Sequence, residues 1–292
     1  MAIIRYLHLG LTSACNLHCK HCFIKEKSAR ELSSEKAISF INILEKQGLT
    51  HIYYTYGEPL LYPPLLEFSK EVQSKGIYQV LMTNGTQVNH EVANEIAKSG
   101  INRVMVSIDS AIEEKHDINR GKQGSFKRAV QAIQLLKEQN VNVGIASTIT
   151  TQNYWELPEI EKLAQENNVQ YISFLACREQ NKIVCPLETE YTDFVLNSIV
   201  ENKHYTFHDF RLIPYVRRWY KNNEITKKQC DAAISSNSCC ADQTLTLAPD
   251  GNIFTCDLTD HEPLGNVYDI NLDTFMLSEL LRKTNTKGCI IA

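Results

Sequence analysis

The sequence predicts an α/β fold, a partial (β/α)6 barrel followed by a small C-terminal α+β domain. Two observations support this prediction. Apolar runs rich in β-branched and aromatic residues alternate with amphipathic stretches through the first two thirds of the 292 residues. The alternation repeats about every 25–30 residues, the length of one strand–helix step. Since a closed barrel takes eight steps in about 250 residues, six steps indicate an open sheet with helices outside.

The six predicted strands are short apolar runs bounded by polar or turn residues: 3–11, 51–56, 78–84, 103–109, 142–148 and 170–176. Helical periodicity predicts helices between them, within 33–48, 64–76, 90–100 and 125–140. Three of these helices end at Gly48, Gly76 and Gly100, and glycine favours a left-handed C-cap. Ser33 is a weaker N-cap signal, because Lys36 stands where a capping box has Glu or Gln.

The pattern changes near residue 205, which divides the chain into an expected barrel over 1–205 and a C-terminal domain over 206–292. The stretch that begins at 205 is predicted to be helical or irregular. Across residues 211 to 228 it carries six cations against Glu224 alone: Arg211, Arg217, Arg218, Lys221, Lys227 and Lys228. A solvated helix face is the favoured interpretation, and a patch that steers an acidic substrate or partner is the alternative.

A β-hairpin is predicted further along this C-terminal region. Two alternating apolar and polar runs flank Pro249-Asp250-Gly251, which is a strong turn signal. Cysteines stand at both ends of the hairpin, Cys239 and Cys240 before it and Cys256 after it.

The bulk composition excludes several classes of protein. The net charge is −4, so nothing global indicates a nucleic-acid or anionic-membrane partner. No apolar run approaches the roughly 20 residues of a membrane span. The N-terminal residues are too few and too interrupted for a signal peptide. These features predict a cytoplasmic protein, in which cysteines serve as metal ligands rather than as disulfides.

Three of the ten cysteines lie close together, Cys15, Cys19 and Cys22, in the spacing C-x3-C-x2-C. A structural zinc site normally takes four protein ligands, and a cubane iron–sulfur cluster takes four cysteines. Three ligands therefore leave one coordination site open, where a small molecule can bind. Five more cysteines follow residue 229, and the remaining two, Cys177 and Cys185, are interpreted as small buried side chains.

Polar residues follow four successive strands of the predicted sheet. Cys15 and its neighbours follow the first, and Gly57-Glu58-Pro59 follow the second. Thr83 to Thr86 follow the third, and Ser107 and Asp109 close the fourth. Each group alone is ordinary turn chemistry. Together they favour a shared pocket, because ligands of parallel α/β sheets bind at the carboxyl ends of the strands.

These residues resemble the radical SAM superfamily. C-x3-C-x2-C after the first strand and Gly-Glu-Pro after the second are the main similarities. Residues 106–126 resemble the stretch after the fourth strand in the SPASM/twitch branch, and the spacing Cys240-x10-Gly251-x4-Cys256 resembles the opening of that branch's C-terminal cluster domain. The family usually has Gly-Gly-Glu, whereas Tyr56 replaces the first glycine here.

The resemblance implies a role for each matching residue. Cys15, Cys19 and Cys22 would hold three irons of a [4Fe–4S] cluster, and the fourth iron would take S-adenosylmethionine (SAM). Phe23 would lie near the adenine, and the backbone of Tyr56, Gly57 and Glu58 would bind the methionine amino group. The remaining positions would contact methionine or ribose (Thr83, Asn84, Ser107 and Asp109) or the carboxylate (Arg120). A flavodoxin or ferredoxin would supply the electron.

A second, auxiliary [4Fe–4S] cluster is the expectation for the C-terminal cysteines. Cys240 and Cys256 would be ligands, Cys289 a third, and Cys230 or Cys239 a fourth. Adjacent side chains of an extended chain point apart, so Cys239 and Cys240 would not both ligate one cluster. A zinc site built from the same cysteines is the alternative.

Three hypotheses for function follow. In the first, SAM is cleaved reductively to a 5′-deoxyadenosyl radical, which abstracts a hydrogen atom from a ribosomally made peptide and leads to a crosslink, an oxidation or an epimerisation. In the second, the radical oxidises or rearranges a small molecule, such as an aminosugar alcohol. In the third, both cysteine sets are structural in a non-catalytic iron–sulfur or zinc protein. The open coordination site, ringed by polar strand ends, argues against the third.

Overall fold

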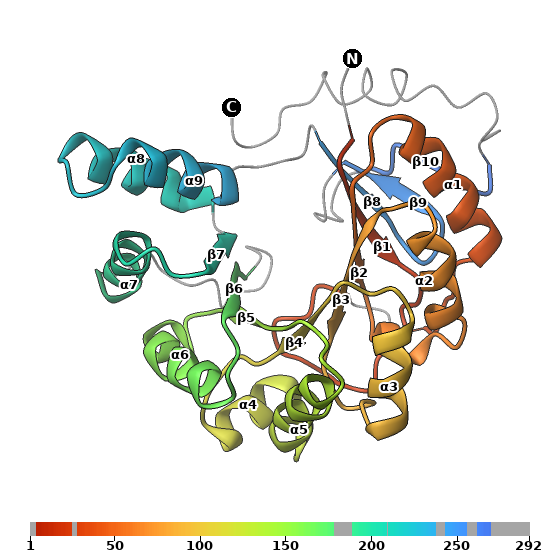
Figure 1. The fold of residues 1–292 in the computed structure, drawn as a ribbon, viewed down its shortest axis with the longest axis horizontal. Helices are drawn as coiled ribbons and strands as arrows, with labels where there is room; N and C mark the ends of the chain where they lie inside the picture. Colours follow the sequence, from red (N-terminus) through yellow and green to blue (C-terminus); the bar gives the residue numbers. More distant parts are fainter. Residues whose placement is uncertain are drawn as a thin grey trace.

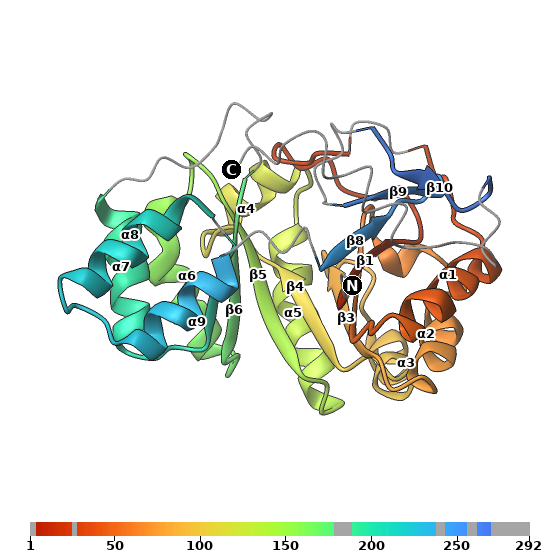
Figure 2. The ribbon, with the colours of Figure 1, turned by 90° about the horizontal axis from the view of Figure 1, so that it is seen from above.

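The structure, a computed structural model, describes residues 4–24, 28–177, 189–208, 210–237, 243–255 and 262–269. Within these residues the strands form one sheet in the order β10-β9-β8-β1-β2-β3-β4-β5-β6-β7. The strands curve into an open arc, and the helices cover its convex side (Figures 1 and 2). This is the α/β partial barrel that the alternating pattern predicts.

All six predicted strands are present: β1 (Tyr6–Gly10), β2 (His51–Thr55), β3 (Tyr78–Thr83), β4 (Arg103–Ser107), β5 (Val143–Ile149) and β6 (Tyr171–Ala176). Each pairs in parallel with the next. The four predicted helices are α1 (Ser34–Lys46), α2 (Leu65–Gln73), α3 (His90–Lys98) and α5 (Ser125–Glu138). Two more cover the sheet, α4 (Glu113–Arg120) and α6 (Leu157–Glu166).

The region after β6 differs from the prediction at one place. Helix α7 (Thr189–Val200) leads into β7 (Tyr205–His208), which adds a seventh parallel strand beside β6. The prediction of helical or irregular structure from residue 205 is therefore wrong for 205–208. It holds for the next elements, α8 (Ile213–Lys221) and α9 (Lys227–Asn237). Arg217, Arg218 and Lys221 of α8 are exposed, as the solvated-face interpretation expects.

The predicted hairpin is confirmed as β8 (Thr244–Leu247) and β9 (Asn252–Phe254), with β10 (Gly265–Asn266) beside β9. Gly251 in its turn has a φ of +85°, which glycine adopts without strain. Strand β8 pairs in parallel with β1, so the barrel sheet continues into the hairpin. A separate domain over 206–292 stays a prediction.

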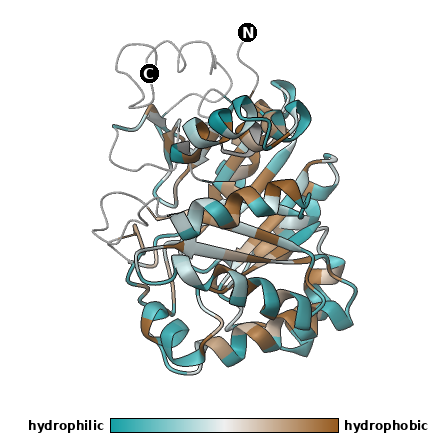
Figure 3. Ribbon diagram, turned by 90° about the vertical axis from the view of Figure 1, so that its left-hand side faces the viewer, coloured by the Kyte–Doolittle hydropathy of each residue, from teal (hydrophilic) through white to brown (hydrophobic). Residues whose placement is uncertain are grey.

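The two faces of the sheet differ in burial. Leu7, Leu9 and Tyr54 point outward and are fully buried against the helices, while their neighbours His8 and Tyr53 point inward and are partly exposed. In Figure 3 single outer helices carry both hydrophobic and hydrophilic residues, as helices that cover a core do. A closed barrel fills its interior with side chains, whereas this barrel keeps an interior that solvent reaches. In the part of the chain that the structure covers, no helix combines the length and apolar character that crossing a membrane requires.

A buried polar side chain, Gln79 of β3, joins the outer face of the sheet to α2. Its Oε1 accepts hydrogen bonds from the hydroxyls of Tyr54 and Ser69, and its Nε2 donates to the carbonyls of Ser69 (3.0 Å) and Gly100 (3.2 Å). Because Gln79 is fully buried, water cannot replace it in these bonds.

We expect Gln79→Leu to lower the free energy of unfolding by about 3 kcal/mol, because it leaves buried hydroxyl and carbonyl groups without partners. Gln73→Leu, on the exposed face of neighbouring α2, is the matched control and should change it by no more than about 0.5 kcal/mol. Denaturant unfolding measures both. Equal losses in the two variants would contradict a structural role for the Gln79 network.

Candidate active site

The cysteine loop, residues 11–24, leaves the carboxyl end of β1. Cys15, Cys19 and Cys22 are all partly exposed in it, and the buried side chain of Leu17 anchors the loop between them. The amide of Cys22 donates to the carbonyl of Cys19 (3.1 Å), which closes a turn. The predicted ligands thus share one short loop at the carboxyl edge of the sheet.

No three His, Cys, Asp or Glu side chains in the described ranges converge as ligands of a single metal ion do. A cubane cluster instead places each thiolate on a different iron, which keeps the ligand sulfurs apart. Soft thiolate donors with one missing ligand fit such a cluster.

The segment after β2 approaches the cysteine loop through its backbone. Tyr56 and Gly57 have φ values of +62° and +43°, so the chain turns sharply at the end of the strand. The amide of Glu58 donates to the carbonyl of Ala14 (2.7 Å). A Cβ added at Gly57 would lie 2.2 Å from that oxygen, so only glycine fits. The ring of Tyr56 packs edge-on against Phe23, with centroids 5.5 Å apart.

The Glu58 carboxylate is hydrogen-bonded to other groups of the protein. It accepts hydrogen bonds from the Thr83 hydroxyl (2.7 Å), the Asn84 amide (2.7 Å) and the Leu60 amide (3.2 Å). Burial raises the pKa of Glu58, and these hydrogen bonds oppose the rise. Glu58 therefore joins the ends of β2 and β3, which leaves its backbone as the part that faces the loop.

The loop that follows β3 is also hydrogen-bonded to the cysteine loop. Asn84 Nδ2 donates to Asn16 Oδ1 (2.9 Å), and Asn16 Nδ2 donates to the Thr86 hydroxyl (2.8 Å). Thr83 and Asn84 thus lie beside Glu58 and the cysteine loop, with their side chains bound to neighbouring protein groups.

Asp109 and Arg120 form a buried, bidentate ion pair beside the cysteines. Arg120 Nη2 donates to Asp109 Oδ1 (2.7 Å), and Arg120 Nε lies 2.7 Å from Asp109 Oδ2. Its Nη1 lies 3.8 Å from the sulfur of Cys19. Burial opposes ionisation of Asp109, but the Arg120 guanidinium prevails and lowers the pKa of that carboxyl. Burial raises the pKa of the Cys19 thiol, and Arg120 opposes that rise.

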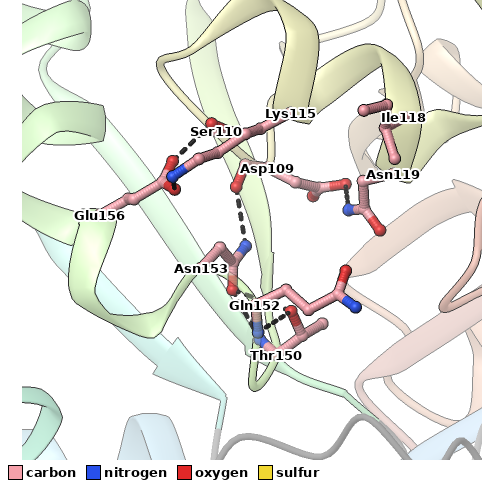
Figure 4. Close-up of a pocket in the computed structure, with 9 residues that line it drawn as sticks. All are labelled: Asp109, Ser110, Lys115, Ile118, Asn119, Thr150, Gln152, Asn153 and Glu156. Atoms are coloured by element: carbon pink, nitrogen blue, oxygen red, sulfur yellow. Dashed lines mark hydrogen bonds and ion pairs between the residues drawn. The ribbon is translucent and has the colours of Figure 1, made fainter.

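A small cavity of about 100 Å³ opens beside this pair (Figure 4). Asn119, which sequence reasoning missed, lines it. Its Nδ2 donates to Asp109 (2.8 Å), while its Oδ1 is buried with no hydrogen-bond partner among the described groups. That oxygen can accept a hydrogen bond from a ligand. The sequence feature that could have pointed to Asn119 is its position next to Arg120, within the stretch 106–126.

A wider groove, about 400 Å³ in volume, separates the cysteine loop from the hairpin. Tyr56 and Ser13 form one wall, and Pro249, Asp250 and Phe254 form the other. Ser107 lies elsewhere, at the carboxyl end of β4 and facing the barrel interior, where it is partly exposed. The direct cofactor contacts predicted for these residues stay predictions.

The second cysteine set is almost entirely outside the described residues, which include neither Cys240, Cys256 and Cys289 nor Cys239 and Cys185. Cys230 is described. It lies in α9, buried in the apolar core. Cys177, at the end of β6, is buried as predicted. The auxiliary cluster and its ligands therefore stay predictions.

Comparison with known proteins identifies the family. The family described as "Radical SAM superfamily" matches residues 9–165, more than half of the chain, and this span includes the cysteine loop and the ends of β2 to β4. The chain belongs to the radical SAM superfamily, whose members are enzymes that use a [4Fe–4S] cluster and SAM.

Two relatives have names that refer to different kinds of product. The Fe-coproporphyrin III synthase of Methanosarcina barkeri is 34% identical over 168 residues, 56% of this chain and 42% of the relative. The antilisterial bacteriocin subtilosin biosynthesis protein AlbA of Bacillus subtilis is 25% identical over 285 residues, 94% of this chain and 59% of the relative. The chain thus spans about half the length of these relatives.

The fold is similar to that of solved radical SAM structures. Streptococcus suis SuiB, in a crystal structure with its precursor peptide SuiA, aligns with a TM-score of 0.77 over 98% of this chain and 68% of SuiB. The sequence identity is 16%, so this likeness concerns the fold.

We expect Gly57→Ala to lower the free energy of unfolding by about 3–4 kcal/mol, because it combines a positive φ with a collision against the Ala14 carbonyl. Gly76→Ala is the matched control: it also has a positive φ but nothing within 4 Å, so it should lose only about 1 kcal/mol. Denaturant unfolding compares them, and equal losses would refute the close backbone approach.

His116, 1% exposed in α4, should make stability depend on pH. Burial, then Arg120, lowers its pKa to about 4 from the model-peptide value of 6.5. The unfolded chain therefore binds the proton between these values, and stability falls as pH drops from 6.5 to 4, by about 3 kcal/mol in total.

Denaturant unfolding of wild type and His116→Asn across that pH range measures how much His116 contributes to the pH dependence of stability. The pH profile of the variant should be flatter by about 3 kcal/mol. Parallel profiles would show that His116 does not titrate differently on folding.

Proposed function

We propose that this radical SAM enzyme modifies a ribosomally made peptide. The observation that supports it most is the closely packed site at the carboxyl edge of the sheet, where a three-cysteine loop meets a backbone turn and opens onto a groove. The peptide-related names of AlbA and SuiB point the same way.

Cys15, Cys19 and Cys22 would hold three irons, and the backbone at Tyr56, Gly57 and Glu58 would receive the methionine amino group. When bound, the reduced cluster and SAM supply a carbon radical that can remove a hydrogen atom from an unactivated carbon. The protein's own part is to exclude water and place one C–H bond within reach. Glu58 and Asp109 support this by fixing the loops around the site.

The interior of the barrel favours an uncharged substrate. The strand register places every second residue of each strand on the face that lines the barrel interior. Among these inward-facing residues of β1 to β7, Arg103 is the one Lys or Arg. The Arg103 guanidinium lies 4.1 Å from the centre of the Tyr171 ring, at the amino end of its strand and away from the cysteines. Hydroxyl and imidazole groups supply the other polar contacts, including Tyr53, Ser107, Thr206 and His208.

This argues against a tetrapyrrole such as that named for the Methanosarcina relative. A coproporphyrin carries several carboxylates, and each needs a cation or several hydrogen-bond donors when it is removed from water. A peptide needs neither, because its backbone and neutral side chains bind hydroxyls and amides. The groove between Tyr56 and the hairpin adjoins the backbone turn and offers space for residues that flank the modified one.

Oxidation or rearrangement of a neutral small molecule, such as an aminosugar alcohol, is the alternative that the interior also allows. A flavodoxin or ferredoxin as reductant and an auxiliary [4Fe–4S] cluster for the C-terminal cysteines complete the proposal.

Reconstituted enzyme, SAM and reductant should yield substrate-dependent 5′-deoxyadenosine under anaerobic conditions. We expect stimulation by short, cysteine-rich or repeat-containing ribosomal precursor peptides, with deuterium passing from labelled peptide into 5′-deoxyadenosine. Cys22→Ala is the control and should abolish the product. Stimulation by coproporphyrin or an aminosugar alone, with none by the peptides, would contradict the peptide proposal.

A further inference from the structure

Helix α4 ends directly against the cysteine loop. The last carbonyls of a helix have no partner within it, and here two of them bind the loop: the carbonyl of Asn119 accepts from the Lys20 amide (2.9 Å), and that of Arg120 accepts from the His18 amide (3.1 Å). These two amides flank Cys19. The cysteine loop therefore caps α4, and α4 holds Cys19 from both sides.

Gly121 makes this approach possible. It ends α4 in the left-handed conformation, with a φ of +68°. A Cβ at this position would lie 2.5 Å from the carbonyl oxygen of His18. The close packing of the helix end on the loop is therefore built into the backbone, independently of any bound group.

The side chain of Arg120 adds a third contact to Cys19. Its Nη1 lies 3.8 Å from the Cys19 sulfur, and its other two nitrogens bind Asp109. The Arg120 side chain is 9% exposed and that of Asp109 is 1% exposed. A buried guanidinium keeps one orientation only while its carboxylate partner holds it.

Protein groups surround the Asp109 carboxylate. Its Oδ1 accepts from Arg120 Nη2 (2.7 Å) and the Thr148 amide (3.0 Å), and its Oδ2 accepts from Asn119 Nδ2 (2.8 Å). Arg120 Nε lies 2.7 Å from the same Oδ2 in the ion pair. The backbone carbonyl of Asp109 is also bound, by Asn153 Nδ2 (2.7 Å), as Figure 4 shows.

We propose that Asp109 is a positioning residue of the cluster site, a role distinct from the contact with methionine or ribose that its position after β4 suggests. It fixes Arg120, and through Arg120 and the end of α4 it sets the place of Cys19 before any cluster is loaded. The inference rests on the proposed ligand role of Cys19, but the order of the loop can be tested without a cluster.

The experiment compares hydrogen exchange of residues 15–23 in cluster-free wild type, Asp109→Asn and Asp117→Asn. Asp117 is the matched control: it lies in α4, next to the same loop, but its carboxylate accepts from the Gly124 and Phe126 amides (2.6 and 2.9 Å) at the start of α5. We expect exchange in 15–23 at least about tenfold faster in Asp109→Asn and unchanged in Asp117→Asn.

Arg120→Lys gives a second test should Asp109→Asn fail to fold. Lysine keeps the charge but cannot reach Asp109 and Cys19 together, so exchange should also rise in this variant. In loaded protein, iron retention against a chelator should fall in both variants.

Unchanged exchange in 15–23, together with a weaker affinity of the loaded protein for SAM, would overturn the proposal and show that Asp109 contacts the cofactor directly. Because the exchange measurement needs neither cluster nor substrate, this failure is distinct from a failure of the proposed peptide reaction.

Discussion

The buried ion pair between Asp109 and Arg120 is the contact on which the shape of the candidate site depends. Two charges are stable inside a protein only when each satisfies the other. Here the pair joins the end of β4 to the end of α4 and reaches the sulfur of Cys19. Glu58 plays the equivalent part between β2 and β3. Two buried carboxylates thus fix the loops that would receive the cofactor.

The fold was largely predictable because its signals are local. A period of 3.6 residues marks the helices, and short apolar runs mark the strands. Glycines such as Gly48 and Gly76 follow helix ends with positive φ values of +103° and +70°. Strand β7 was missed because four residues are too few to show alternation. The place of the site was predictable from parallel topology, since the carboxyl ends of the strands meet at one edge.

The partners of the site's side chains were not predictable. The sequence puts Asp109 after a strand and Arg120 at the end of a helix, and only the path of the chain between them shows that they bind each other. Likewise, Glu58 follows β2, yet its carboxylate binds groups that follow β3. The family resemblance assigns Glu58, Asp109 and Arg120 to contacts with the cofactor. The structure shows which protein groups these residues bind.

The central claim is that Cys15, Cys19 and Cys22 hold an open-site iron–sulfur cluster. An iron and sulfide count on anaerobically reconstituted protein, with the triple alanine variant beside wild type, tests it most directly. We expect a loss of about four irons per chain in the variant, since each cubane contains four. A remainder of about four would reveal an auxiliary cluster. Iron that is unchanged in the variant, or zinc in its place, would show that these cysteines hold no such cluster.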